Sequence, residues 1–147
     1  MNRRATPYRL VSPAVAEDEL HASVARALDV LLLPPAMWAT YPAGSVPLPP
    51  EYAAKLTRLG LKRGWPDILI VHGPSYGIEL KRPGGVLSRT RTVRTRRGAL
   101  RVLDGQEDVF PRLEDAGMRI GVCRSVDEVL AQLRAWGLPL RNARVAA

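Results

Sequence analysis

Residues 67–81 decide the fold of this chain and read DILIVHGPSYGIELK. Two runs rich in aliphatic and β-branched residues, 67–71 and 77–81, flank the segment 72–76, which contains glycine and proline. Two β-rich runs around a short turn segment are typical of a β-hairpin. The centre of the sequence therefore predicts two adjacent antiparallel strands.

Three polar residues lie on these predicted strands. Asp67 opens the first run, and Glu79 and Lys81 lie two residues apart on the second. Because side chains alternate along a strand, Glu79 and Lys81 project from one face while Leu80 points away. If the hairpin pairs, Asp67 approaches Glu79, and two converging carboxylates repel each other unless a cation accompanies them.

Magnesium suits such a site because it prefers oxygen ligands and is commonly held by one or two carboxylates with water and phosphate. A bound metal polarises a phosphate and activates water. Lys81 would add positive charge where the transition state gains negative charge, or help to activate the attacking water. The residues therefore predict phosphodiester hydrolysis.

Periodicity predicts the elements around this centre. Apolar residues three and four apart indicate helices, and short β-rich runs indicate strands. We expect helices over about 17–33, 51–59, 104–116 and 125–136, and further strands over 37–41 and 118–123. Asp104 is expected to cap the third helix, with Glu107 reaching back to it. This order predicts an α/β fold with a mixed central sheet flanked by helices.

Length and composition indicate one globular domain. The 147 residues suit a single domain, which we place at 14–140 between a loose N-terminal tail, 1–13, and a C-terminal tail, 141–147. No apolar run approaches the ~20 residues that span a bilayer, and the first residues lack the apolar stretch of a secretory signal. We therefore expect a cytoplasmic protein without a membrane partner. Cys123 is the only cysteine, which excludes an internal disulfide, and its apolar neighbours predict a buried thiol.

The net charge of +8 comes from one segment. Residues 81–101 hold eight Lys or Arg and no acid, and the remaining 14 basic residues match the 14 acidic ones. Such a basic block is typical of nucleic-acid binding. Its arginine-rich part, about 88–103, could be a ribbon or a flexible loop. The expected DNA-binding residues are Lys55, Arg58, Lys62, Arg82, Arg89, Arg91, Arg94, Arg96, Arg97 and Arg101. For those before Arg82, a solvated helix face is an equal explanation.

Two further polar residues are candidates for the site. Glu17 shares the apolar face of the first helix with Leu20 and Val24, where an acid requires a partner, although a solvated acid near a helix start is the alternative. Gln106 stands at the start of the third predicted helix, where it could contact phosphate or simply cap the helix.

Two motifs resemble those of the PD-(D/E)XK nuclease superfamily: Gly64-Trp65-Pro66-Asp67-Ile68-Leu69 and Ile78-Glu79-Leu80-Lys81-Arg82-Pro83-Gly84-Gly85. With residues 55–60 (KLTRLG) and 124–129 (RSVDEV), they are similar to its VRR-NUC branch, especially the stand-alone phage and prophage forms, over about residues 15–140. The arginine-rich segment is an insertion relative to that branch, and Val122-Cys123-Arg124 is the nearest match to its Val-Arg-Arg motif.

The resemblance implies a restriction-endonuclease-like core. It implies that Asp67, Glu79 and the Leu80 backbone carbonyl ligate Mg²⁺ or Mn²⁺, and that Lys81 is catalytic. Glu17 would match the acid of the first helix, and Gln106 the glutamine that follows the lysine strand. The implied activity is DNA cleavage by a homodimer in a bacterial or phage-infected cell, on branched DNA such as Holliday junctions.

Two other functions remain open from the sequence. A non-catalytic DNA-binding module that retained the fold would depend on the arginines but not on the carboxylates. A nuclease acting on RNA would use the same site residues and differ only in its substrate.

Overall fold

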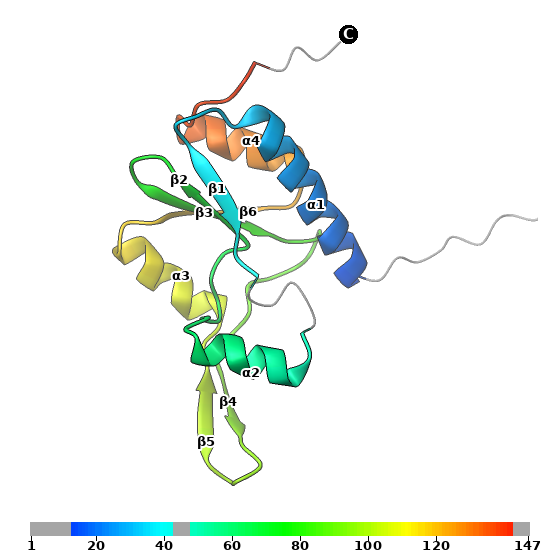
Figure 1. Ribbon diagram of the computed structural model, residues 1–147, viewed down its shortest axis with the longest axis vertical. Helices are drawn as coiled ribbons and strands as arrows, with labels where there is room; N and C mark the ends of the chain where they lie inside the picture. Colours follow the sequence, from blue (N-terminus) through cyan, green and yellow to red (C-terminus); the bar gives the residue numbers. More distant parts are fainter. Residues whose placement is uncertain (1–12, 43–47, 143–147) are drawn as a thin grey trace, which may run out of the picture.

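The computed structural model describes residues 13–42 and 48–142, which form helices, a four-stranded sheet and a separate two-stranded hairpin (Figure 1). The helices are α1 (Pro13–Leu31), α2 (Pro50–Arg58), α3 (Gln106–Asp115) and α4 (Val126–Ala135). The strands are β1 (Met37–Thr40), β2 (Ile68–Val71), β3 (Ser75–Leu80), β4 (Arg91–Arg94), β5 (Leu100–Leu103) and β6 (Arg119–Cys123). The predicted α/β class is confirmed.

The four-stranded sheet is mixed and has the order β1-β2-β3-β6. Strands β1, β2 and β3 pair antiparallel, and β6 pairs parallel to β3. A parallel neighbour requires a long crossover connection. Here the crossover contains the β4–β5 hairpin and α3. The basic segment is therefore carried on the connection that leaves β3 at the predicted site.

The main core lies on one face of the sheet. The side chains of Ile68, Ile70 and Ile78 on this face are fully buried, because α1 and α4 pack over them (Figure 1). Val24 and Leu28 contribute from α1, and Val129 and Leu133 from α4. Each fully buried aliphatic side chain contributes roughly 1.5–3 kcal/mol. Because side chains alternate along β2 and β3, the residues between these isoleucines, and Glu79 next to Ile78, project from the other face of the sheet.

Some element boundaries differ from the sequence predictions. Helix α1 begins at Pro13, four residues before the predicted start, because proline lacks an N–H and suits a first turn. The predicted tail 1–13 otherwise lies outside the described residues, as do residues 143–147. The Arg141 N–H donates to the Leu31 carbonyl at 2.7 Å, so the described chain is still attached to the body there.

The predicted cap of α3 is wrong. The N-cap residue is Gly105, which makes no side-chain cap hydrogen bond, and Asp104 instead lies 3.4 Å from Arg112. Ser88 satisfies the first turn of the helix: its hydroxyl accepts from the Gln106 N–H at 3.0 Å and its carbonyl from the Glu107 N–H at 3.0 Å. A residue 18 positions upstream thus replaces the local capping pattern.

Cys123 is buried at 2 % exposure, and burial, followed by the negative charge of Glu128, raises the pKa of its thiol to about 11. The predicted buried thiol is confirmed, and a raised pKa disfavours the reactive thiolate form. Among the described residues, no helix combines the length and apolar character needed to cross a membrane.

Candidate active site

Strand register brings Asp67 and Glu79 together. In the β2–β3 pair Ile68 lies opposite Ile78, so Asp67, directly before β2, comes opposite Glu79. The Leu80 N–H donates to Asp67 Oδ2 at 2.8 Å, which fixes the direction of that carboxylate. Leu80 itself points into the core, as alternation predicts. The expected meeting of the two acids at the hairpin is therefore confirmed.

Glu79 is the one buried charged residue of the described chain, with 2 % exposure. Its Oε1 accepts from Lys81 Nζ at 2.9 Å and from Gln106 Nε2 at 2.5 Å. Its Oε2 is buried and has no hydrogen-bond partner among the described residues. A buried carboxylate oxygen without a partner costs free energy, so it calls for a ligand.

The pKa of Glu79 is raised from 4.5 to about 7. Burial is the largest cause, and the neighbouring negative charge of Asp67 raises the pKa further. The hydrogen bonds from Lys81 and Gln106 lower it but do not compensate. The site therefore disfavours the ionised form of Glu79, and the nearby donors supply too little positive charge to stabilise it.

A hard divalent cation fits this arrangement. The groups that converge here are oxygens of two carboxylates, beside the backbone of Leu80, and magnesium prefers such ligands and completes its shell with water. Within 13–42 and 48–142, no three His, Cys, Asp or Glu side chains are close enough to share one ion. The site therefore offers two carboxylates, which suits a magnesium-type ion rather than zinc.

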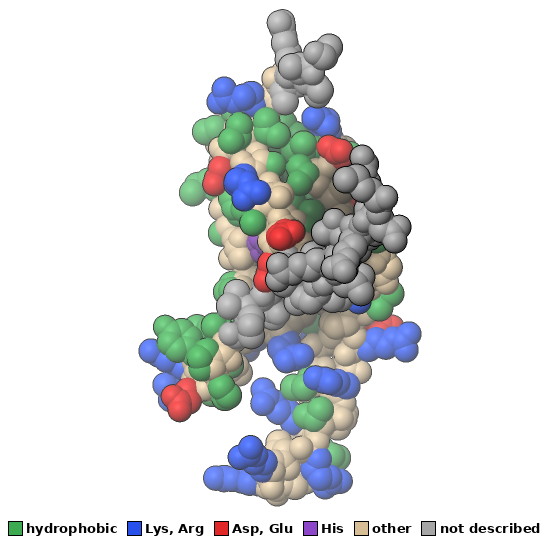
Figure 2. All heavy atoms as spheres, turned by 90° about the vertical axis from the view of Figure 1, so that its right-hand side faces the viewer, with side chains coloured by type: hydrophobic (Ala, Val, Ile, Leu, Met, Phe, Trp, Pro, Cys, Tyr) green, Lys and Arg blue, Asp and Glu red, His purple; other side chains and the backbone are tan. Residues whose placement is uncertain are grey.

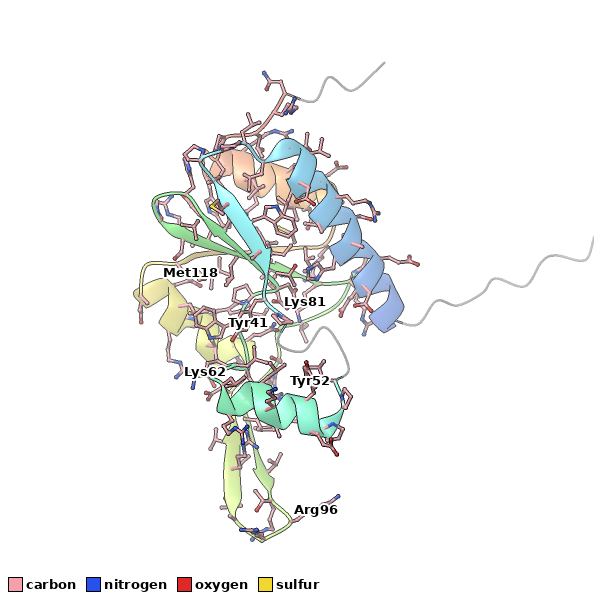
Figure 3. All side chains as sticks on the ribbon, in the orientation of Figure 1. Tyr41, Tyr52, Lys62, Lys81, Arg96 and Met118 are labelled. Atoms are coloured by element: carbon pink, nitrogen blue, oxygen red, sulfur yellow. The ribbon has the colours of Figure 1, made fainter. Side chains whose placement is uncertain are left out.

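Lys81 lies just beyond the end of β3, at the end of the sheet nearest α2 (Figure 3). Its side chain is 15 % exposed, so the ammonium group is partly screened from water and held against Glu79. The predicted placement of Lys81 on the same face as Glu79 is confirmed. The sequence placed it correctly because residues two apart on a strand share a face.

Gln106 is positioned by a residue that the sequence analysis missed. Its Oε1 accepts from the Ser88 N–H at 3.1 Å, and its own N–H donates to Ser88 Oγ. These bonds leave the Gln106 amide nitrogen directed at Glu79. No local pattern marks Ser88, because its contacts reach across 18 residues of sequence.

The site opens into a cavity of about 1090 Å³. Asp67, Glu79, Leu80 and Lys81 line it together with the first part of α1, helix α2, residues 61–64 and the β4–β5 hairpin. Glu17 and His21 line the cavity from α1, as does Asp18, which the sequence analysis did not select. Glu17 thus faces the same space, but it does not form a three-acid cluster with Asp67 and Glu79.

The predicted DNA-binding residues divide into two groups. Arg58, Lys62 and Arg101 line the cavity, joined by Arg63. The others are exposed and lie outside the cavity lining: Lys55, Arg82, Arg89, Arg91, Arg94, Arg96 and Arg97. Figure 2 shows Lys and Arg side chains on the hairpin at the lower end of the molecule, with no acidic side chain among them in that view.

An aromatic contact holds one wall of the cavity. The Tyr41 hydroxyl accepts from the Lys62 N–H at 2.9 Å and donates to the Lys62 carbonyl at 3.1 Å. The Tyr41 ring stacks on Trp65 with centroids 5.3 Å apart. These contacts anchor the backbone of Lys62 beside the site, and Trp65 has a packing role in them.

Replacing Gln106 by alanine is expected to lower metal affinity or hydrolysis roughly 10- to 100-fold, because Glu79 loses a donor that orients it. Isothermal titration with Mn²⁺ and the rate of DNA cleavage would measure the effect. Gln132→Ala on α4 is the matched control, since Gln132 packs near Gly121 rather than in the cavity. Equal behaviour of the two variants would contradict a positioning role for Gln106.

Comparison of the chain with protein-family models, with curated proteins and with solved structures found no match in any of the three.

Proposed function

We propose that the chain is a metal-dependent DNA endonuclease that hydrolyses phosphodiester bonds, with Asp67, Glu79 and Lys81 at its centre. The observation that carries the proposal is the buried Glu79, whose Oε2 has no partner among the described residues while Asp67 lies opposite it. This pair sits in a cavity with basic side chains on its walls. Acidic ligands beside basic walls suit a cation and a phosphate together.

Asp67, Glu79 and the Leu80 carbonyl would hold Mg²⁺ or Mn²⁺, as the resemblance to the VRR-NUC branch implies. When bound, such a cation supplies Lewis acidity toward the phosphate and lowers the pKa of water. The donor set agrees with that ion, because all of its atoms are oxygens.

The side chains of the chain supply the remaining functions. Lys81 places a positive charge next to the carboxylates, where it can orient water and stabilise the charge that develops on the phosphate. Gln106 holds Glu79 Oε1, which leaves Oε2 to face a ligand. Arg58, Lys62 and Arg101 bind the phosphates on either side.

The finer parts of the proposal come from the same resemblance. We assign the fold to the restriction-endonuclease-like class, in agreement with a mixed sheet that carries Glu79 near the end of β3 and Lys81 just beyond it. We assign the substrate to branched DNA such as Holliday junctions, and the active form to a homodimer. Analytical ultracentrifugation of the full chain with and without a junction tests the last point.

The decisive experiment incubates the full chain with a four-way junction, a linear duplex, a single strand and a matching RNA. Each substrate is combined with Mg²⁺, with Mn²⁺ or with chelator, and Asp67→Asn prepared in the same way controls for contaminating nucleases. We expect metal-dependent cleavage of DNA, fastest on the junction, that the variant loses. Binding without any metal-dependent cleavage would instead support the non-catalytic DNA-binding module.

A further inference from the structure

The β4–β5 hairpin projects from the body of the protein as a sheet of its own (Figure 1). An isolated two-stranded ribbon is marginally stable in water, so its attachment to the body is important. The Gly105 N–H donates to Thr90 Oγ1 at 2.9 Å, and a Cβ at Gly105 would collide with the backbone of Arg89 and Thr90. Together with the hydrogen bonds between Ser88 and Gln106, these contacts fix the base of the ribbon on the start of α3. The base of the ribbon therefore lies beside Gln106, which donates to Glu79.

The two faces of the ribbon differ in their surroundings. Arg91 pairs with Leu103 and Val93 pairs with Arg101, so these four side chains share one face. Val93, Arg101 and Leu103 line the same cavity as Asp67 and Glu79. The opposite face carries Thr92, Arg94, Leu100 and Val102, and it is exposed. One face of the ribbon is thus directed at the candidate active site and the other at solvent.

The ribbon carries far more positive charge than its surroundings neutralise. Residues 89–101 contain six arginines and no acid. Among the described residues, only Arg89 of these six forms an ion pair, a long one of 3.8 Å to Glu107. Arg96 lies at the tip, away from the body (Figure 3), and Arg97 beside it is also exposed. Such unneutralised arginines are costly unless a polyanion binds there.

We propose that this ribbon enters the major groove of double-stranded DNA next to the cleavage position. The proposal rests on the nuclease function above and deepens it by naming duplex DNA, on the hairpin side of the cut, as the partner. A two-stranded ribbon fits the major groove, which is about 12 Å wide. The ribbon from residue 91 to its tip spans about 20 Å at ~3.3 Å per residue, or about six base pairs at ~3.4 Å each.

Aromatic stacking distinguishes this partner from a single strand. Proteins that bind single strands combine a basic groove with aromatic platforms on which bases stack. No Phe, Trp or Tyr lies on the ribbon, and none lines the cavity among the described residues. Arginines without aromatic neighbours instead match phosphates and the guanine edges of a major groove.

The test measures binding separately from cleavage. In the presence of chelator, fluorescence anisotropy compares a 20-base-pair duplex with its single strand for the wild type and for the triple variant Arg94→Gln, Arg96→Gln, Arg97→Gln, whose three arginines are exposed and lie outside the cavity lining. The matched control replaces three exposed arginines away from the ribbon: Arg26→Gln, Arg134→Gln, Arg141→Gln. Circular dichroism checks that both variants fold.

We expect the ribbon variant to bind the duplex about 30- to 100-fold more weakly. The slope of log binding constant against log salt concentration should become less steep by about 3, since each phosphate contact contributes ~0.9 to that slope. Single-strand affinity should change less than threefold, and the control variant should match the wild type. Dimethyl sulfate footprinting should show protection of guanine N7, a major-groove atom, over about six base pairs on one side of the cut.

Other outcomes would overturn the proposal. An equal loss of duplex and single-strand affinity would make the ribbon a general phosphate tether, and protection of adenine N3 alone would place it in the minor groove. Undiminished duplex binding would exclude the ribbon from the interface altogether. Because these measurements need no hydrolysis, they distinguish a failed ribbon from a failed nuclease. Conversely, the rate on thymidine 5′-p-nitrophenyl phosphate with Mn²⁺ reports on the catalytic centre and should not change in the ribbon variant.

Discussion

Replacing Asp67 by asparagine should lower the rate of DNA hydrolysis by about 10³-fold. Asparagine keeps an oxygen that can accept the Leu80 N–H, so the local backbone should stay in place. It removes the negative charge that, with Glu79, would hold the cation. Losing one preorganised charged group at a reacting phosphate typically costs about 10²–10⁴ in rate.

Single-turnover cleavage at saturating Mg²⁺, together with thermal unfolding, would measure this effect. Asp127→Asn is the matched control, because Asp127 is an exposed acid in the first turn of α4, away from the cavity. The control should retain wild-type cleavage. An Asp67→Asn variant that keeps more than a tenth of the wild-type rate would remove Asp67 from the catalytic centre.

Replacing Glu79 by glutamine should stabilise the metal-free protein at pH 8 while abolishing hydrolysis. The pKa of Glu79 is about 7 in the folded chain against 4.5 as its ordinary value. Folding therefore favours the protonated acid: the stability it contributes is complete below pH 4.5, falls as the pH rises toward 7 and is lost above it. The shift corresponds to about 3 kcal/mol, and Glu79→Gln avoids this loss.

Thermal unfolding between pH 4 and pH 8, in chelator, would measure the difference between the two proteins. The variant should gain stability relative to the wild type only as the pH rises, reaching roughly 10 °C in Tm at pH 8. Adding Mg²⁺ at pH 8 should stabilise the wild type and leave Glu79→Gln unchanged, because binding to the folded state alone raises stability. Parallel stability curves for the two proteins would contradict the burial of a charged Glu79.

Much of the site could be predicted because it depends on local rules. Alternation placed Glu79 and Lys81 on one face and Leu80 in the core, and the turn between 71 and 77 implied the hairpin that brings Asp67 opposite Glu79. The β3 strand began earlier than expected, at Ser75, because the turn is shorter than its glycine and proline content indicated. The nuclease activity and the family resemblance remain proposals.

The cap of α3 shows where local reasoning failed. Asp104 and Glu107 fit a capping pattern, yet Gly105 is the cap residue and Ser88 satisfies the first turn. The physical reason is competition: a serine brought near by the hairpin base offers both a hydroxyl and a carbonyl, whereas Asp104 pairs with Arg112. The same contact positions Gln106 on Glu79, so no short window of sequence could reveal it.

The amino-acid sequence by itself determined the order of the four helices and of the four strands of the main sheet. It also determined which strand face each site residue occupies and that the excess charge is confined to one segment, because these features follow from periodicity and composition. Tertiary structure alone decided that the arginine-rich segment is a ribbon, that one of its faces lines the cavity, and that Glu79 is buried with an oxygen lacking a partner among the described residues. Burial and long-range hydrogen bonds depend on chain segments that are distant in sequence, and periodicity carries no information about which of them meet.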